Sequence, residues 1–534
     1  MNLLSRNIFP ALSLACLILA GMAGCKKQEE ELALERMFMP TGDIAITTDD
    51  TSAMLTWDAA LFTRGQVISY TVELSQDTLF QSAGQTFTTD TSGITITQEH
   101  LAPREKYFIR VKTNGANGTP ESKWLTSNGF SITGEQLFLP LESTDIIDKA
   151  VILKWEATPG LTKIVITPAG GTSLTIPLTA AESTGGQKMI SALTPSTQYT
   201  AELFKEEQSK GYLEFSTKAS LSGDHIVDLS GITGRPSVLA DTLPALAAGS
   251  IVVLKRGETY EVSSELVVSN GVSIISENSF DPALPVIYFS SNMNIATGSN
   301  IDSLVFRELT LRGSSFSSKY VMNINKAGAI GNISFESCHI EIFRGVVRLQ
   351  TSAVGGTQVN SVNINNCVID SISNYGVINV DNAACAVQHI AVQNSTIYKA
   401  EKVLVSKQQS TSVVLDACTI HEAPQGGGSN YLVDYNANQV VNGISVINCI
   451  LGTGRNNNGN LTVRGIRAGA STQVSSGNSY HTADYEAVSH AIPGLIPYDG
   501  TAAGLFLAPA QGDFTITDNS FAGRSTAGDP RWRP

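Results

Sequence analysis

The sequence predicts an all-β protein in which two small β-sandwiches precede a right-handed parallel β-helix. Three observations support this fold class. Of the 534 residues, 42% are hydrophobic and only 16% are charged, which excludes disordered chains and coiled coils. Short bursts of alternating hydrophobicity, typical of half-buried strands, fill the first part of the chain. An eight-residue pattern then recurs through the second half at an interval that is typical of a solenoid.

The chain is acidic. It has 35 Lys and Arg residues against 48 Asp and Glu residues, so its formal net charge is 35 − 48 = −13. An acidic protein has no electrostatic attraction for phosphate backbones, so we expect no nucleic-acid partner. Seven cysteines are too few and too dispersed in a chain of this length to form a disulfide scaffold.

Residues 1–24 have the pattern of a secretory signal peptide, because Arg6 precedes an apolar run that is too short to span a bilayer. Residues 22–25, Met-Ala-Gly-Cys, resemble a bacterial lipobox, which implies that Cys25 is lipidated and anchors the chain to a membrane. An ordinary signal peptide with an incidental cysteine is the alternative. Residues 25–39 form a tether that resembles the acidic export signal of Bacteroidetes surface lipoproteins. This resemblance implies an outer-membrane location facing the cell exterior.

Residues 40–135 and 136–219 each have the pattern of a small antiparallel sandwich. In the first stretch, Trp57 lies on an early strand and Tyr107 follows a Leu-Ala-Pro turn, as in the tyrosine corner of fibronectin type III modules. Trp155 and Tyr199 occupy matching places in the second stretch. Both stretches resemble fibronectin type III modules, which implies core positions for the four aromatic residues and a spacer role for the modules.

Six octads define the second half of the chain, and their first, third, sixth and eighth positions are apolar or small. They occupy residues 304–311, 333–340, 362–369, 390–397, 413–420 and 444–451. Repeats of about 20–30 residues with short strands predict a parallel β-helix with one turn per repeat. We expect this helix to cover residues 220–480, with a short capping helix at 242–248 and a C-terminal capping segment at 481–534.

Stacked turns place like positions on like, because adjacent parallel strands lie about 4.8 Å apart. The fifth octad position holds Asn366, Asn394 and Asn448, and asparagine tolerates the left-handed backbone of a tight bend. The sixth position holds Cys338, Cys367, Ser395, Cys418 and Cys449. We expect free thiols packed inside the bend. Disulfides between adjacent turns, or a metal, are the alternatives.

The strands that follow the octads carry a polar strip on their outer side. One outward column contains Asn323, Arg348, Asn379, Val405 and Asp434, and a second contains Asn325, Gln350, Asp381, Lys407 and Asn436. The nearby aromatic residues are Tyr320, Tyr375, Tyr398, Tyr431 and Tyr435. Cations, amides and rings suit an anionic sugar, and an ordinary solvated face is the alternative. The predicted carbohydrate-binding residues are Arg348, Tyr375, Asn379, Asp381, Lys407, Tyr431, Asp434 and Asn436.

The strip lacks the paired carboxylates of a glycoside hydrolase. A Ca²⁺-dependent lyase stays open as an alternative, with Asp381 and Asp434 as metal ligands and Lys407 or Arg348 as the base. Two turns, roughly 10 Å, would separate the two acids. Apart from Ca²⁺ in that alternative, we expect no cofactor.

Residues 249–260 resemble the opening turn of pectate-lyase-like helices. Residues 512–516 and 528–532 resemble the end signature of an uncharacterised family of Bacteroidetes surface lipoproteins with fibronectin type III modules. The resemblance implies a setting among proteins that capture and degrade plant polysaccharide, pectin in particular, and it implies no catalytic residues. Three hypotheses follow: a non-catalytic protein that binds or presents acidic polysaccharide beside other glycan-utilisation proteins, a polysaccharide lyase, and a structural or adhesive surface protein.

Overall fold

A computed structural model describes residues 35–61, 67–81, 84–116, 118–425, 430–454 and 462–534. The predicted signal peptide and the predicted lipidation site, Cys25, lie outside these residues. Within the described residues, no helix is both long and apolar enough to cross a membrane. Two sandwiches and a solenoid follow one another along the chain, and each is described by itself.

The first sandwich has a three-stranded and a four-stranded antiparallel sheet among the described residues. Its strands are β1 (Thr41–Thr48), β2 (Ser52–Asp58), β3 (Tyr70–Ser75), β4 (Gln85–Thr89), β5 (Gly93–Thr97), β6 (Phe108–Thr113) and β7 (Leu125–Thr126). Trp57 is buried and packs edge-on against Tyr70, with ring centres 5.5 Å apart. The hydroxyl of buried Tyr107 accepts a hydrogen bond from the Ala102 N–H at 3.0 Å, which is the predicted tyrosine corner.

The second sandwich consists of a four-stranded sheet and a strand pair among the described residues. Its elements are β8 (Ala150–Lys154), β9 (Lys163–Pro168), β10 (Leu174–Pro177), α2 (Ala180–Gly185), β11 (Gln187–Ser191), β12 (Gln198–Lys205) and β13 (Gln208–Ser216). Trp155 and Tyr199 are both buried, as predicted, and Tyr199 stacks on Phe215 with ring centres 5.5 Å apart. The sequence analysis missed α2, although Thr179 and Glu182 form a capping box at its start.

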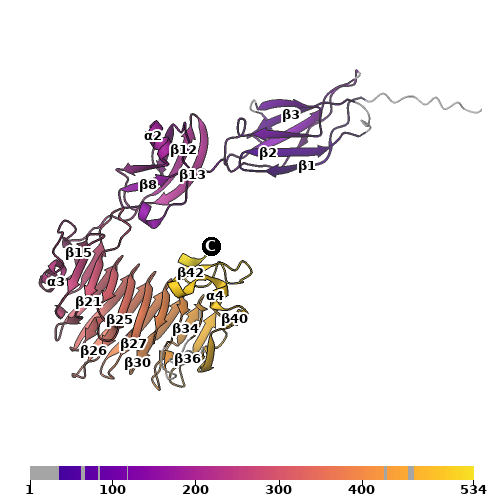
Figure 1. Cartoon of the computed structure of the whole chain (residues 1–534). Coiled ribbons are helices and arrows are strands. Elements are labelled where there is room, and N and C mark those ends of the chain that lie inside the picture. The colour runs from indigo at the N-terminus through magenta and orange to yellow at the C-terminus, as the bar shows by residue number, and fades with distance from the viewer. Residues whose placement is uncertain (1–34, 62–66, 82–83, 117, 426–429, 455–461) are drawn as a thin grey trace, which may run out of the picture. The chain divides into compact units, whose positions relative to one another are not determined.

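The solenoid begins with a ten-stranded sheet among the described residues, and each turn contributes one strand (Figure 1). The strands are β14 (Ile226–Asp228), β15 (Ser250–Leu254), β18 (Val272–Ser276), β21 (Asn300–Arg307), β24 (Gly328–Glu336), β26 (Thr357–Asn365), β28 (Ala386–Gln393), β31 (Ser412–Asp416), β34 (Ile444–Ile447) and β37 (Val474–Gly477). All pair in parallel. Their register aligns the first positions of all six octads, which confirms the repeat alignment.

A longer sheet of 17 described strands closes the solenoid. Its strands are β16 (Thr259–Val262), β17 (Leu266–Val268), β19 (Val286–Phe289), β20 (Met293–Ile295), β22 (Thr310–Gly313), β23 (Tyr320–Ile324), β25 (His339–Leu349), β27 (Val368–Val380), β29 (Thr396–Ala400), β30 (Leu404–Ser406), β32 (Thr419–His421), β33 (Tyr431–Asp434), β35 (Ile450–Leu451), β36 (Thr462–Arg467), β38 (Tyr480–His481), β39 (Glu486–Ser489) and β40 (Ile496–Pro497). The pairing therefore continues past residue 480.

The longer sheet has two arms, because β25 and β27 each pair with two different strands of a neighbouring turn. In the first arm, the starts of β25 and β27 pair with β22 and β29. In the second arm, their ends pair with β23 and β30. One continuous hydrophobic core, lined by residues such as Phe306, Phe335 and Leu349, fills the space between the sheets.

A left-handed residue forms the bend between the ten-stranded sheet and the first arm in successive turns. The residues are Glu308, Ser337, Asn366, Asn394, Ala417, Asn448 and Asn478, with φ between 48° and 54°. Where the bend residue is asparagine, its side-chain amide also bonds to the neighbouring turn. Asn478 Nδ2 donates to Asn448 Oδ1 at 2.9 Å, and Asn448 Nδ2 donates to Asp416 Oδ1 at 3.0 Å. Asparagine thus meets two demands of the bend, because it tolerates the backbone conformation and links adjacent turns.

The five described cysteines are free and buried. Four of them, Cys338, Cys367, Cys418 and Cys449, occupy the sixth octad position, where the sequence analysis expected free thiols. The Cys338 N–H donates to Cys367 Sγ at 3.4 Å, and the Cys367 N–H donates to Ser395 Oγ at 3.0 Å. The sixth octad position therefore forms a stacked column within the bend. Burial raises the pKa of Cys338 and of Cys418, so both thiols stay protonated and unreactive in the folded protein.

Two further segments pack against the solenoid. At the start lie α3 (Val238–Thr242) and η2 (Leu243–Ala245). The helix predicted at 242–248 was therefore placed too late, because residues 246–249 leave the helical conformation before β15. The C-terminal segment, residues 502–533, contains α4 (Ala502–Leu505), β41 (Phe506–Ala508), η3 (Pro509–Gln511), β42 (Asp513–Ile516) and η4 (Pro530–Trp532). Its Asp529 accepts a hydrogen bond from Thr396 of the first arm at 2.8 Å.

The buried thiols predict a specific pattern of chemical reactivity. In a protein whose Cys16 and Cys25 are replaced by serine, no thiol should react with a disulfide reagent on the timescale of minutes under native conditions. Five should react after unfolding in guanidinium, because only then are the thiols exposed to attack. Absorbance of the released chromophore counts them. A thiol that reacts rapidly in the folded protein would contradict the buried column.

The asparagine bend predicts a difference between two substitutions at Asn448. N448G keeps the left-handed conformation and loses the side-chain hydrogen bonds, which costs about 1 kcal/mol each. N448V loses the same bonds and also places a β-branched residue at positive φ, which adds about 1–2 kcal/mol. Denaturant unfolding of the two variants measures the difference. Equal destabilisation by N448G and N448V would show that the left-handed backbone conformation at residue 448 does not restrict which side chain is tolerated.

Candidate functional site

The outer face of the second arm carries the predicted polar strip. The register places Asn323, Arg348, Asn379, Val405 and Asp434 in one column, as expected, and extends it to Arg467. The preceding position of each strand points inward and is buried. These inward residues are Met322, Val347, Ile378, Leu404, Val433 and Ile466. The alternation shows why apolar and polar residues follow one another in this arm.

Six side chains from four successive turns form the Arg348 cluster: Tyr320, Arg344, Arg348, Tyr375, Asp381 and Lys407. The Arg348 guanidinium lies 4.0 Å from the centre of the Tyr375 ring and donates to Asp381 Oδ2 at 2.5 Å. Lys407 Nζ donates to the other oxygen of Asp381 at 2.8 Å. Asp381 thus joins two cations. Burial opposes its ionisation, but the hydrogen bonds from Lys407 and Arg348 outweigh burial and lower the pKa of Asp381.

Gly345 makes the aromatic part of this cluster fit. It pairs with Tyr320 on one side and with Gly376 on the other. A Cβ atom at Gly345 would lie 2.9 Å from Tyr375 Cβ and 3.2 Å from Tyr320 Cδ1. The missing side chain lets the Tyr320 and Tyr375 rings meet edge to face at 5.7 Å, and both hydroxyls then reach Arg348.

Five side chains farther along the arm form the Arg467 cluster: Tyr431, Asp434, Arg464, Arg467 and His490. Arg467 binds Asp434 through two hydrogen bonds of 2.8 and 2.7 Å, and its guanidinium lies 4.3 Å from the centre of the Tyr431 ring. Arg464 donates to the Tyr431 hydroxyl at 3.1 Å, and the His490 ring meets Tyr431 edge-on. The hydrogen bond to Asp434 raises the pKa of Arg467, so this guanidinium is permanently charged.

Several predicted binding residues differ from expectation in exposure. Asn379 is only 4% exposed and donates from its amide to the Tyr375 carbonyl at 2.9 Å, so it supports Tyr375 from below. Tyr431 is only 5% exposed, because guanidinium groups cover it. A ligand would therefore meet the arginines and not the ring. Asn436 is exposed at the end of β33, and Lys407 has the most exposed charged group of the Arg348 cluster.

Two tyrosines named with the strip lie elsewhere. Tyr435 is fully buried inside the solenoid and donates to Ser410 Oγ at 2.7 Å. Tyr398 lies on the first arm, where its ring packs against Phe514 of the C-terminal segment. The candidate metal ligands Asp381 and Asp434 belong to different clusters, and each is already bound by a cation. A Ca²⁺ ion at either carboxylate would have to displace those cations.

The sequence analysis missed Arg344, Arg464 and Arg467. A signal exists for all three, because both clusters contain an arginine followed by glycine, Arg344-Gly345 and Arg464-Gly465, with a second arginine three or four residues after the first. In each case a tyrosine of the preceding turn pairs with one residue of this Arg-Gly dipeptide: Tyr320 pairs with Gly345, and Tyr431 pairs with Arg464. The two clusters are thus variants of one arrangement.

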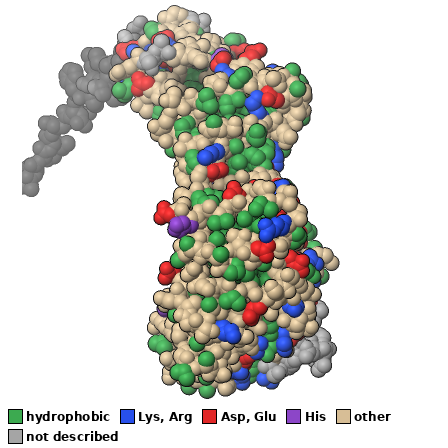
Figure 2. All heavy atoms as spheres, turned by 90° about the vertical axis from the view of Figure 1, so that its left-hand side faces the viewer, with side chains coloured by type: hydrophobic (Ala, Val, Ile, Leu, Met, Phe, Trp, Pro, Cys, Tyr) green, Lys and Arg blue, Asp and Glu red, His purple; other side chains and the backbone are tan. Residues whose placement is uncertain are grey.

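The clusters make the strip positive in an acidic chain. They contain five Lys or Arg side chains and two Asp side chains, so their formal charge is 5 − 2 = +3, without His490. Figure 2 shows one face of the molecule, on which lysine and arginine side chains gather near the lower end while carboxylates are spread more evenly. A local excess of fixed positive charge attracts anions even when the whole protein is negative.

Comparisons with known proteins identify parts of the chain. Residues 39–128 match the fibronectin type III domain, in agreement with the first sandwich. Residues 258–400 and 390–532 match two families described as domains of unknown function, DUF4957 and DUF5123. No curated protein matches the chain.

Among solved structures, the chain is similar to the FN1–FN3 domains of chicken CNTN1, at 12% identity and a TM-score of 0.16 over 34% of this chain and 66% of that one. It is also similar to a two-domain fibronectin type III segment of chicken tenascin, at 15% identity and a TM-score of 0.18 over 34% of this chain and 99% of that one. The fibronectin type III assignment of the first sandwich rests on its family match and its geometry.

The paired Asp381 carboxylate predicts a pH-dependent contribution to stability. Because its pKa is lowered on folding, the contribution is present above the unfolded-state pKa of about 3.9 and is lost as the pH falls through the lower folded-state value. We expect D381N to destabilise the protein by about 1 kcal/mol at pH 7 and the difference to vanish in acid. Urea unfolding from pH 7 to pH 2 tests this, with D302N as an exposed control. A difference that persists in acid would contradict the ion-pair explanation.

Proposed function

We propose that this chain is a lipid-anchored surface protein whose solenoid binds an acidic, pectin-type polysaccharide along the second arm without cleaving it. The observation that carries the proposal is the positive strip formed by the Arg348 and Arg467 clusters. Its guanidinium groups are held by stacking and by carboxylates, so they are ordered before a ligand arrives. Preorganised charged donors lose little entropy on binding a carboxylate.

The form of the surface supports a polymer ligand. The strip runs across successive turns, and its side chains repeat at the strand spacing of about 4.8 Å. A polyuronate presents carboxylates at regular intervals along a chain, so it can contact several turns at once. A small anion would need only one of the two clusters.

The arrangement favours binding over catalysis. Lys407 and Arg348, the candidate bases of a lyase, both donate to Asp381. A base must instead accept a proton from the substrate. The two carboxylates of the strip lie in separate clusters, which does not suit a hydrolase that needs acid and base on either side of one bond.

The location rests on the sequence of residues 1–39. The short apolar run, the lipobox-like residues 22–25 and the charged tether support a lipoprotein anchored through Cys25 in the outer membrane of a Bacteroidetes species. The pectate-lyase-like resemblance and the fibronectin-like modules support a glycan-utilisation setting. There the modules would hold the solenoid away from the membrane and beside other glycan-utilisation proteins.

Affinity electrophoresis and calorimetry with polygalacturonate test the proposal. We expect retardation by polygalacturonate, weaker binding at high salt, and no binding to a neutral polysaccharide, because the contacts are electrostatic. R348A combined with R467A should weaken binding at least tenfold, or about 1.4 kcal/mol. R307A is the matched control. Arg307 is also paired with a carboxylate, Glu336, at 2.6 Å, but it lies on β21 of the ten-stranded sheet and not on the second arm.

Other outcomes point to the alternatives. A rise in ultraviolet absorbance, from unsaturated uronate products, would replace binding with lyase activity. Unretarded migration on every acidic glycan, together with recovery of a protein partner in pull-downs, would instead favour a structural or adhesive role. Equal loss of binding in R307A would mean that the strip is not the ligand surface.

A further inference from the structure

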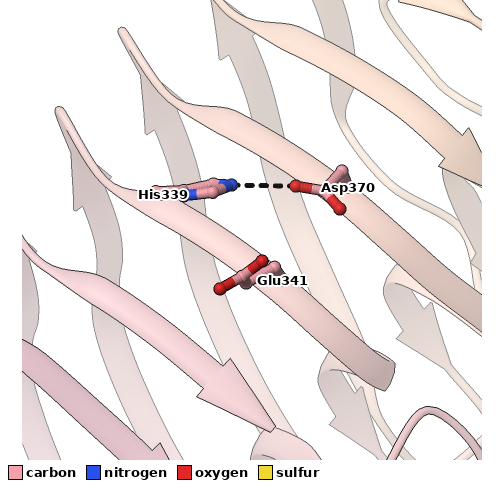
Figure 3. A group of neighbouring side chains, drawn as sticks. All are labelled: His339, Glu341 and Asp370. Carbon is pink, nitrogen blue, oxygen red and sulfur yellow. Dashed lines mark hydrogen bonds and ion pairs between the residues drawn. The ribbon is translucent and has the colours of Figure 1, made fainter. Parts of the chain in front are cut away.

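A second cluster of chemically active side chains lies on the outer face of the first arm, away from the strip. His339 and Glu341 are two residues apart on β25, so both side chains point outward on the same face. The register pairs Glu341 with Asp370 of β27, one turn farther on. Figure 3 shows the three side chains gathered across the two neighbouring strands. Residues 31 positions apart in sequence are thus brought together by one turn of the solenoid.

The donor atoms of these side chains converge. His339 Nε2 lies 2.8 Å from Asp370 Oδ2, and one atom from each of the three residues lies within 4.8 Å of the others. Ligand atoms of a tetrahedral zinc site lie about 3.3 Å apart, given bonds of about 2.0–2.1 Å. Small rotations of the His339 and Glu341 side chains would bring the ligand atoms from their present separations of up to 4.8 Å to this spacing.

The surroundings hold the carboxylates in place. Ser371 Oγ donates to Asp370 Oδ1 at 2.7 Å, and Tyr398 also hydrogen-bonds this carboxylate. The Tyr398 ring is itself fixed against Phe514. On the other side, Arg312 donates to Glu341 Oε1 at 3.0 Å. Hydrogen bonds from neighbouring groups to ligating carboxylates are a general feature of metal sites.

The cluster is sheltered without being closed. The Asp370 and Glu341 side chains are 10% and 17% exposed, and His339 is 39% exposed. An ion held there would keep open positions on the solvent side for water or for a ligand group. This is the arrangement of a three-ligand site, as opposed to a closed structural site with four protein ligands.

We propose that His339, Glu341 and Asp370 form a binding site for a divalent transition-metal ion, with Zn²⁺ as the best match. One imidazole nitrogen and two carboxylate oxygens suit a borderline metal such as Zn²⁺ or Co²⁺. Ca²⁺ is disfavoured, because it takes six to eight oxygen ligands. The formal charges also fit, since the two carboxylates and Arg312 sum to −1 together with the neutral form of His339 that ligates a metal. The site is independent of the proposed polysaccharide surface.

The test is metal titration of the chelator-treated full chain without an affinity tag. We expect one equivalent of Co²⁺ to bind with a visible absorption band, and Zn²⁺ to displace it. H339Q and D370N should each weaken binding at least tenfold, since each loses a ligand. H389Q is the matched control, because His389 is also a strand histidine on the outer face and bonds Ser412 at 2.9 Å.

A further variant keeps the proposal testable if the ligand substitutions disturb folding. R312Q removes the cation that competes for Glu341 and leaves all three ligands, so we expect it to bind Co²⁺ severalfold more tightly. Circular dichroism of the metal-free variants checks that the fold is retained. The proposal is overturned if no stoichiometric ion binds, if H339Q and D370N bind as the unmodified chain does, or if H389Q is as weak as H339Q.

Discussion

Parallel pairing between successive turns is the interaction on which the solenoid depends. Each strand of one turn donates and accepts backbone hydrogen bonds with the next, and the register never shifts in the ten-stranded sheet between β18 and β34. Where the register is constant, a position recurs at the same place one turn farther on. In the longer sheet the pairing of β25 with β27 shifts between Phe343 and Gly345, and the columns continue on either side of this shift. The buried thiol column, the asparagine bends and both surface clusters all depend on this stacking of successive turns.

Much of this arrangement could be predicted from the sequence. The octads gave the register, and the register gave the bend residues Asn366, Asn394 and Asn448 and the buried column at Cys338 and Cys367. These predictions succeeded because stacking converts a sequence offset directly into a spatial neighbour. The alignment also contained the pairing of Glu341 with Asp370, although the sequence analysis did not examine the outer face of the first arm.

The burial of Tyr431 and Asn379 and the start of α3 depend on side-chain contacts that cannot be derived from the spacing of the repeats. Guanidinium groups of the next turn, from Arg464 and Arg467, decide how far Tyr431 is exposed. The sequence of that turn lies after the last octad, so the repeat alignment did not include it. Asn379 lies in the predicted column, yet neighbouring side chains and its own bond to the Tyr375 carbonyl bury it. The helix α3 begins four residues before its predicted start, since the buried residues Val238 and Leu239 fix its position against the core.

The two arginine clusters have a consequence for how ligand length would matter. Four turn spacings separate Arg348 from Arg467 in their shared column, which corresponds to about 19 Å. If the strip binds polysaccharide as proposed, a fragment shorter than this span would engage one cluster, whereas a longer chain bound at one cluster would meet the second at a high effective concentration. Apparent affinity would then rise steeply at a threshold length, and the protein would discriminate polymers from their breakdown products by avidity alone.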